Sequence, residues 1–340
     1  MINRITIVVL LLLALLTDSC RKKEPVFENF RGFTQGTNYS IIFERKRRIS
    51  PSEIKNEVEN ILSDFDLSLS LYKDSSIISR INRNEDVVID SYFEEAFIIS
   101  RQVYELTSGA FDITVGPLVK AWGFGPEETK NFTESKRDSL LRLVGMDKVS
   151  LQNGRIIKSD PGINLDLNAI AQGYSVDVLC RYFDGLGISN YLIEIGGEVR
   201  GKGTRAGADW RIGIDKPVDN NMSPGQTLEA IIRISSKALA TSGNYRKFYI
   251  ENGIKYSHTI DPATGYPAKN TLLSATIIAD DCATADAVAT ACMVMGKDKS
   301  IEFIRSHPQF GAYFIFSDES GSFRTWISDN LKDHISETGE

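Results

Sequence analysis

The sequence predicts an α+β fold in which the strands are concentrated in the C-terminal half. Hydrophobic residues make up 42% of the 340 residues, which is enough to bury a sizeable core. Helical and strand-like patterns alternate irregularly, without the β-α-β succession of a doubly wound sheet. Rossmann and Walker A motifs are absent from the sequence, so nucleotide binding by those folds is not supported. A chain of this length accommodates two domains or one large one.

Strands and helices are predicted from the spacing of apolar residues. An early strand is predicted at 36–43, and six strand-like runs follow at 191–195, 210–214, 228–234, 272–279, 312–316 and 323–327. A Ser-Pro-Ser-Glu capping box at 50–53 predicts one helix start, and Ser-Tyr-Phe-Glu at 91–94 predicts a second. Helices are also predicted at 169–182 and, in an Ala-rich stretch, at 282–295.

The N-terminus is typical of an export signal. Arg4 precedes a nearly unbroken apolar run at 5–16, which is shorter than the about 20 apolar residues of a transmembrane helix. Cys20 follows in a setting that resembles the lipidation site of bacterial lipoproteins. We expect residues 1–19 to be a lipoprotein signal peptide, and 20–28 to be a tether on the periplasmic side of a bacterial membrane. A cleaved signal and an uncleaved anchor are the alternatives.

Charge and cysteine content exclude several classes of function. The net charge is −6 and basic blocks are absent from the sequence, which argues against binding to nucleic acid. Besides Cys20, the cysteines are Cys180, Cys282 and Cys292, and no CxxC pair occurs. This pattern predicts neither a disulfide framework nor a zinc site. We expect three buried, inert thiols.

The first polar cluster begins at Asp166, just before a predicted helix. A carboxylate at this position can cap free backbone N–H groups of the helix, and it can equally line a ligand site. Gly173 lies in the first turns of the same helix, where Gly costs roughly 1 kcal/mol relative to Ala. That cost indicates close approach of another group, such as a ligand. Gly196 and Gly197 follow a predicted strand and permit a similar approach, although an ordinary tight turn explains them equally well.

His258 and Asp261 form the second candidate, beside the Thr-Ser-Gly-Asn run at 241–244. A histidine near an Asp-Pro-Ala-Thr-Gly turn can carry a proton near neutral pH. The alternative is a structural histidine, with Asp261 forming an Asx-turn.

Asp286 and Thr290 form the third candidate. They lie four residues apart in the Ala-rich helix, so their oxygens share one face. A carboxylate, a hydroxyl and nearby carbonyl groups are hard oxygen donors of the kind that Mg²⁺ prefers. The alternative is a threonine bonded to the carbonyl one turn back, with the aspartate in solvent.

Taken together and in this order, these clusters resemble the ApbE family, the FAD:protein FMN transferases. Further segments that carry the resemblance lie at 36–40, 70–75, 80–82, 109–118 and 122–124. The resemblance implies a mixed ApbE-like fold with one flavin transferase domain at 29–335.

The resemblance also implies site residues. Mg²⁺ would be held by Asp286, Thr290 and the main-chain oxygen of Ala169. The flavin nucleotide site would be formed by Gln35, Tyr72, Ala110, Phe111, Asp112, Asp166, Gln172 and Thr259. Gln172 stands where many relatives carry Lys or Glu, and Gln35 replaces the usual Met, so the contacts of these two residues with FAD differ from the family pattern.

The implied reaction is Mg²⁺-dependent transfer of FMN from FAD to a Ser or Thr hydroxyl of another protein, with release of AMP. The expected partner is a flavoprotein subunit of a membrane redox complex that carries a Ser/Thr-Gly-Ala-Thr motif. His258 is the preferred base for the hydroxyl proton, with Asp261 and Asp166 as rivals. Two competing functions are an FAD pyrophosphatase and an FAD-binding lipoprotein without catalytic activity.

Overall fold

The computed structural model describes residues 25–46, 49–124, 132–217, 227–244, 248–251, 254–257 and 259–338. The proposed signal peptide and Cys20 lie outside these residues. The helices are α2 (Pro51–Leu69), α3 (Ile77–Asn82), α4 (Ser91–Leu106), α5 (Gly116–Ala121), α6 (Glu134–Leu141), α7 (Asn168–Gly185), α8 (Cys282–Met295) and α9 (Lys297–Ser306). No helix among the described residues is long and apolar enough to cross a membrane.

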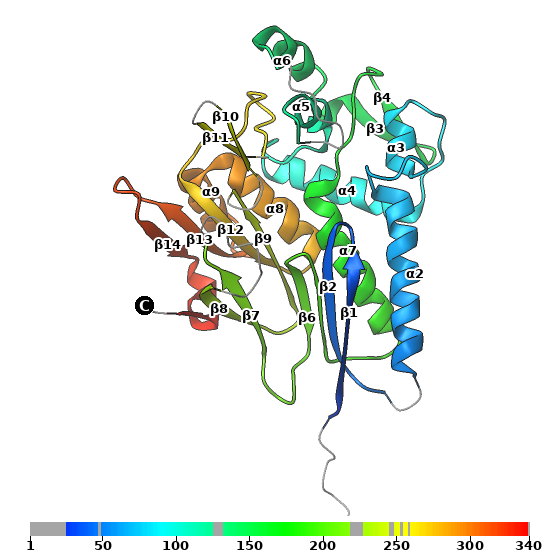
Figure 1. Ribbon diagram of the computed structural model, residues 1–340, viewed down its shortest axis with the longest axis vertical. Helices are drawn as coiled ribbons and strands as arrows, with labels where there is room; N and C mark the ends of the chain where they lie inside the picture. The colour runs from blue at the N-terminus through cyan, green and yellow to red at the C-terminus, as the bar shows by residue number, and fades with distance from the viewer. Residues whose placement is uncertain are drawn as a thin grey trace, which may run out of the picture.

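An antiparallel sheet of eight strands forms the centre of the molecule (Figure 1). Its order is β1 (Phe27–Thr34), β2 (Thr37–Glu44), β5 (Tyr191–Ile195), β6 (Glu198–Lys202), β9 (Lys237–Gly243), β12 (Leu272–Ala279), β13 (Gly311–Ser317) and β14 (Phe323–Ile327). A second sheet is formed by β15 (Ile335–Glu337), β8 (Leu228–Ile234) and β7 (Trp210–Asp215). Two hairpins complete the strands, β3 (Val149–Gln152) with β4 (Arg155–Lys158), and β10 (Phe248–Glu251) with β11 (Ile254–Ser257). The prediction of an α+β fold with most strands in the C-terminal half is confirmed.

Successive residues of the central strands face two different cores. In β12, Ala275 and Ile277 pack into the core on the helical side, whereas Ile278 packs toward the three-stranded sheet. In β13, Phe314 packs into the core on the helical side and Tyr313 packs toward the three-stranded sheet. Side chains of a strand alternate between its two faces, and here both faces are buried. The sequences of these strands are therefore nearly continuous apolar runs.

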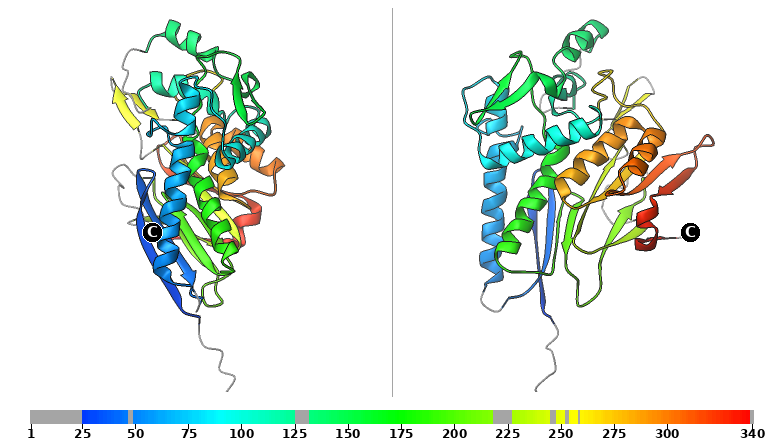
Figure 2. Two further views of the ribbon diagram at one scale, coloured as in Figure 1. Left: turned by 90° about the vertical axis from the view of Figure 1, so that its right-hand side faces the viewer. Right: turned by 180° about the vertical axis from the view of Figure 1, so that it is seen from behind.

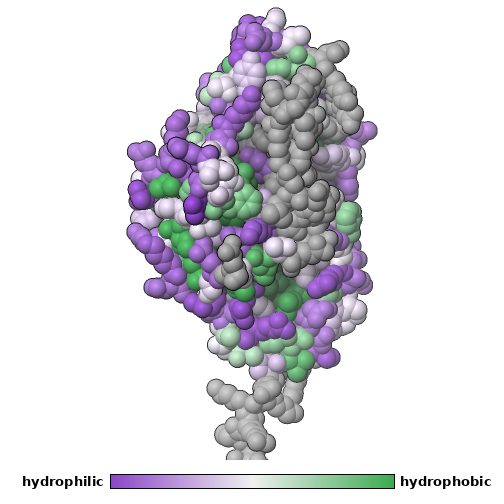
Figure 3. Space-filling model, turned by 60° about the vertical axis from the view of Figure 1, so that its left-hand side comes forward, coloured by the Kyte–Doolittle hydropathy of each residue, from purple (hydrophilic) through white to green (hydrophobic). Residues whose placement is uncertain are grey.

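Helices α7 and α8 lie side by side against the sheet (Figure 2). Helix α8 packs on β9 and β12, and α7 packs on β5 and β6. The outer surface seen in Figure 3 is largely hydrophilic, with hydrophobic residues in small groups, because most large apolar side chains are turned inward.

Both predicted capping boxes were wrong in detail, although the helices are present. The side chain of Ser50 makes no capping bond to α2, since its hydroxyl pairs with Ser52 at 2.7 Å. Helix α4 is capped by Asp90, whose carboxylate accepts from the backbone N–H of Phe93 at 2.8 Å. Ser91 is therefore the first helical residue. Carboxylates and serines compete for the same N–H groups, and sequence spacing alone did not separate them.

Gly173 allows α7 and α8 to touch. A Cβ at this position would lie 2.3 Å from the carbonyl oxygen of Cys282 and 2.8 Å from the Cβ of Asp286. The close approach inferred from the sequence is therefore made by another helix.

Gly173→Ala is expected to destabilise the protein by about 1–3 kcal/mol, because backbone atoms of α8 would have to move away. Gly185→Ala is the matched control in the same helix, since a Cβ there meets nothing within 4 Å. It should be neutral or stabilising by up to about 1 kcal/mol, the helix propensity of Ala over Gly. Urea denaturation of both variants measures the difference. Equal stabilities would show that the helices do not require Gly173.

Candidate functional site

The contact between α7 and α8 brings Asp286, a predicted metal-binding residue of α8, to the helix that contains another, Ala169. The backbone N–H of Gly173 donates to Oδ2 of Asp286 at 3.1 Å. In a regular helix this N–H points to the carbonyl oxygen four residues earlier, which belongs to Ala169. The hydrogen bond therefore brings the carboxylate of Asp286 to the start of α7, where Ala169 also lies.

Asp286 is a buried carboxylate, 7% exposed. Burial raises its pKa to about 7, and the hydrogen bond from Gly173 partly opposes this rise. Within the described part of the chain, no ion pair to a Lys, Arg or His side chain compensates its charge. A buried carboxylate without a charged partner is costly, and a bound cation would supply the missing charge.

Thr290 lies one turn further along α8 and faces β9. Its hydroxyl lies 3.2 Å from the hydroxyl of Ser242. Asn244 is two residues beyond Ser242 and directly follows the end of β9. The side-chain oxygen of Asn244 is buried without a hydrogen-bond partner. Ser242 and Asn244 belong to the Thr-Ser-Gly-Asn run at 241–244, whose sequence alone did not indicate their role.

These groups fit a hard divalent cation. One carboxylate, two hydroxyls and a main-chain carbonyl are all oxygen donors, and Mg²⁺ completes its octahedron with water and substrate phosphates. The described residues contain no cluster of three or more His, Cys, Asp or Glu side chains, so the candidate set is the mixed one around Asp286. The side-chain oxygen of Asn244, buried without a partner, supports the same reading, because such an atom is normally satisfied by a ligand or water.

Gln35 and Gln172 are linked through Ser175 of α7, whose hydroxyl contacts the side chain of Gln35 and the carbonyl of Gln172. Gln35 has a φ of 49° at the tip of the β1–β2 hairpin, and its Oε1 accepts from Ser175 at 3.5 Å. Its Nε2 is buried without a partner. A Cβ on Gly196 would lie 3.1 Å from the amide of Gln172, so only glycine fits between these elements. Two predicted flavin-binding residues that are 137 positions apart in the sequence therefore lie together at the first turns of α7.

Tyr72 and Asp166 form a second group. Partial burial, and secondly the negative charge of Asp166, raise the pKa of Tyr72. Tyr72 nevertheless remains 69% exposed at the surface. The carboxylate of Asp166 accepts from the N–H of Asn168 at 2.9 Å, which is the capping role that the sequence left open. The backbone N–H of Asp166 donates to the carbonyl of Ile113 at 2.7 Å. This bond places the segment that contains Asp112 next to the start of α7.

The predicted flavin residues at 110–112 are largely part of the protein interior. Phe111 is 2% exposed and packs in the core, and Ala110 packs against it from the edge. Asp112 is 6% exposed, and its carboxylate accepts from the N–H and hydroxyl of Thr114 at 2.7 and 2.6 Å. Burial raises the pKa of Asp112. These contacts fix the conformation of the loop, and they leave the side chains of Phe111 and Asp112 buried.

Thr259 and Asp261 lie in a separate turn. Thr259 is 9% exposed, and its carbonyl accepts from Ala268 at 2.8 Å. The carboxylate of Asp261 accepts from the N–H of Ala263 and the hydroxyl of Thr264, both at 2.9 Å. Asp261 therefore forms the Asx-turn that was its alternative role. His258 lies outside the described residues.

The structure is therefore that of an α+β protein with a buried, oxygen-rich site between two helices that pack on its central sheet. The model of the ApbE family matches residues 35–314. The FAD:protein FMN transferase of Vibrio cholerae is 34% identical over 336 residues, covering 95% of this chain and 96% of that protein. The Haemophilus influenzae protein of the same name is 35% identical and covers 96% of each chain.

Solved structures agree with the sequence comparison. The flavin transferase ApbE from Vibrio cholerae superposes with a TM-score of 0.81 at 32% identity, covering 91% of this chain and 99% of that one. The apo form of the Pseudomonas stutzeri flavinyl transferase ApbE also gives 0.81, at 29% identity and with 91% and 97% coverage. The chain therefore belongs to the ApbE family, and it is a transferase enzyme.

Proposed function

We propose that this protein transfers FMN from FAD to a Ser or Thr hydroxyl of a partner protein, in a Mg²⁺-dependent reaction that releases AMP. The observation that carries the proposal is the buried carboxylate of Asp286, which lies one helical turn from Thr290 on α8, accepts a hydrogen bond from α7 and has no cationic partner among the described residues. The names of the relatives support the flavin substrate and the protein acceptor.

Each part of the chain has a distinct task in the proposed reaction. Asp286, Thr290 and the carbonyl of Ala169 hold the cation, which, when bound, neutralises charge on the pyrophosphate. Gln35 and Gln172 contribute amide groups to the flavin site at the first turns of α7, where Gln35 contacts Ser175 and Gln172 packs against Gly196. The acceptor oxygen forms a bond to the FMN phosphorus, the bond from that phosphorus to the AMP oxygen breaks, and the hydroxyl proton passes to a base.

His258 is the base that we propose for that proton. Asp261, its rival, uses both carboxylate oxygens within its own turn. Asp166 uses one oxygen to cap α7. One solved structure of the Vibrio cholerae enzyme is of a variant in which a histidine is replaced by glycine, and that structure resembles this chain with a TM-score of 0.81.

Export and lipidation at Cys20 form a further part of the proposal, and they rest on the sequence pattern at 1–20. Cys20→Ser is expected to move the protein from the membrane fraction to the soluble fraction, or to leave an uncleaved precursor, since one acylated residue provides the anchor. Fractionation and intact mass of the two forms test this. Identical fractionation and mass would show that Cys20 carries no lipid.

The transfer reaction is tested with purified protein, FAD, Mg²⁺ and a peptide that carries a Ser/Thr-Gly-Ala-Thr motif. The expected product is a peptide whose mass increases by one FMN, with one AMP released for each modified peptide. Asp286→Asn should lower the rate by roughly 10²-fold or more, because it removes the charge that holds the cation. Its melting temperature should not fall, because Asn avoids the cost of a buried carboxylate. Release of FMN and AMP without peptide modification would identify an FAD pyrophosphatase instead.

His258→Ala is expected to slow transfer by about 10²–10⁴-fold, the usual contribution of a general base. FAD affinity should change little, and the rise of the wild-type rate through a pKa of roughly 6–7 should disappear. Single-turnover transfer, FAD titration and thermal melting on this variant separate the two roles. A lower melting temperature with parallel losses of binding and turnover would indicate a structural histidine.

A further inference from the structure

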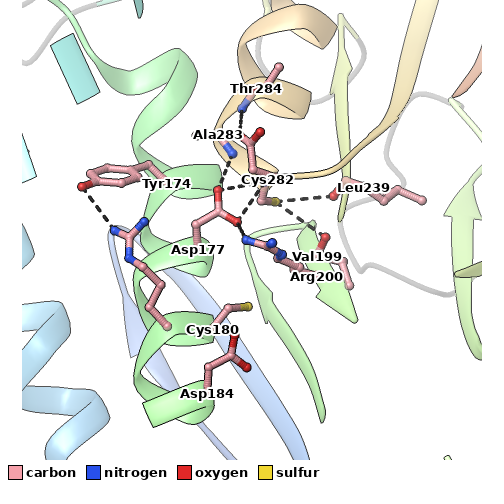
Figure 4. A network of polar contacts seen from close by, with 12 residues as sticks. Tyr174, Asp177, Cys180, Asp184, Val199, Arg200, Leu239, Cys282, Ala283 and Thr284 are labelled. Carbon is pink, nitrogen blue, oxygen red and sulfur yellow. Dashed lines mark hydrogen bonds and ion pairs between the residues drawn. The ribbon is translucent and has the colours of Figure 1, made fainter. Parts of the chain in front are cut away.

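A polar network outside the proposed metal-binding set joins α7, α8 and the sheet. Asp177 lies one turn beyond Gly173 on α7, and its carboxylate accepts from the backbone N–H of Cys282 at 2.8 Å and of Ala283 at 2.9 Å (Figure 4). These N–H groups belong to the first turn of α8 and have no acceptor within their own helix. A side chain of one helix therefore caps the start of the next.

The capping carboxylate is itself held from the sheet. Asp177 is 3% exposed and forms an ion pair with Arg200 of β6. Burial raises the pKa of Asp177 to about 6, and Arg200 and the two N–H groups act in the opposite direction by stabilising the charged form. The negative charge also lies at the positive end of the α8 dipole.

The first residue of α8 has a second attachment to the sheet. The thiol of Cys282 lies 3.6 Å from the carbonyl oxygen of Val199 in β6 and 3.8 Å from that of Leu239 in β9. The start of α8 is thus fixed to α7 by Asp177 and to two strands by Cys282.

Two successive contacts set the register of the two helices. Asp177 binds the N–H groups of Cys282 and Ala283, and Gly173, one turn earlier on α7, binds Asp286, one turn later on α8. A sliding or tilting of α8 at its start would therefore move Asp286 relative to the carbonyl of Ala169.

From this geometry we propose that Asp177 is a positioning residue for the metal site: it sets the register of α8 against α7 and so the spacing of the cation-binding oxygens. The inference rests on the proposed function, because it concerns the same cation. Asp177 acts through Asp286 and touches neither the cation nor the substrate. Its role differs from that of Asp281, the ordinary N-cap of α8, which accepts from the N–H of Thr284 at 2.7 Å within its own chain segment.

The test compares Asp177→Asn with Asp281→Ala by calorimetric titration of the folded, FAD-free protein with MgCl₂ or MnCl₂. Both variants weaken the capping of α8, so both should melt at a lower temperature. Only Asp177→Asn should weaken cation binding, by about 10- to 100-fold, the usual effect of removing a group that orients a ligand. Asp281→Ala should stay within about twofold of the wild type. Equal affinities in all three proteins would overturn the inference.

A second variant covers the outcome in which Asp177→Asn does not fold, since it leaves Arg200 without its buried partner. Asp177→Leu together with Arg200→Met replaces the ion pair by apolar side chains of similar volume, an exchange that proteins often tolerate. It should also lose at least tenfold in cation affinity, and wild-type affinity in this variant would contradict the proposal. If the wild-type protein itself bound neither cation, the proposed function would fail and this inference with it. Cation binding of equal affinity by the wild type and both Asp177 variants would contradict the role of Asp177 but leave the proposed function intact.

Discussion

The close contact of α7 and α8 at Gly173 is the constraint on which the candidate site depends. A single Cβ at this position would collide with the backbone of Cys282. Without that Cβ, the N–H of Gly173 reaches Asp286, so this carboxylate is held at the start of α7, where Ala169 lies. The two helices are packed on one face of an eight-stranded sheet that is buried on both sides, so their positions are fixed by the interior of the protein.

The remaining parts of the site converge on the same end of α7. The β1–β2 hairpin brings Gln35 to Ser175, the turn after β5 brings Gly196 to Gln172, and the carboxylate of Asp166 caps the first turn. Each element comes from a different part of the chain. Short motifs that are spread over most of the sequence, within the residues matched by the family model, therefore lie near one another in the fold.

Much of the fold was predictable because local burial determined it. The strands β5, β8, β12 and β14 and helix α8 have the predicted boundaries, and β12 and α8 are apolar runs that end at polar residues or glycine. Strand β1 was not predicted as a strand, and its first residues had been assigned to the tether. It is an edge strand with a half-exposed pattern, so its sequence lacks that signal.

The site was less predictable because its key contacts join distant residues. The spacing of Asp286 and Thr290 on one helix identified them as candidates, but the sequence did not indicate that Gly173 contacts Asp286. Asp177 carried no signal, since its partners Arg200 and Cys282 lie 23 and 105 positions away. For Asp261, the same sequence pattern suits a catalytic base and an Asx-turn, and only the structure reveals that its oxygens are used within the turn.

The most direct test of the central claim is a crystal structure of the protein with Mn²⁺ and FAD, with the ion located by anomalous scattering. The account predicts one ion between α7 and α8, bound to the carboxylate of Asp286, the hydroxyl of Thr290 and the carbonyl of Ala169 at roughly 2.0–2.3 Å, with the FAD phosphates completing its shell. An ion at another position, or FAD phosphates bound away from Asp286, would contradict it.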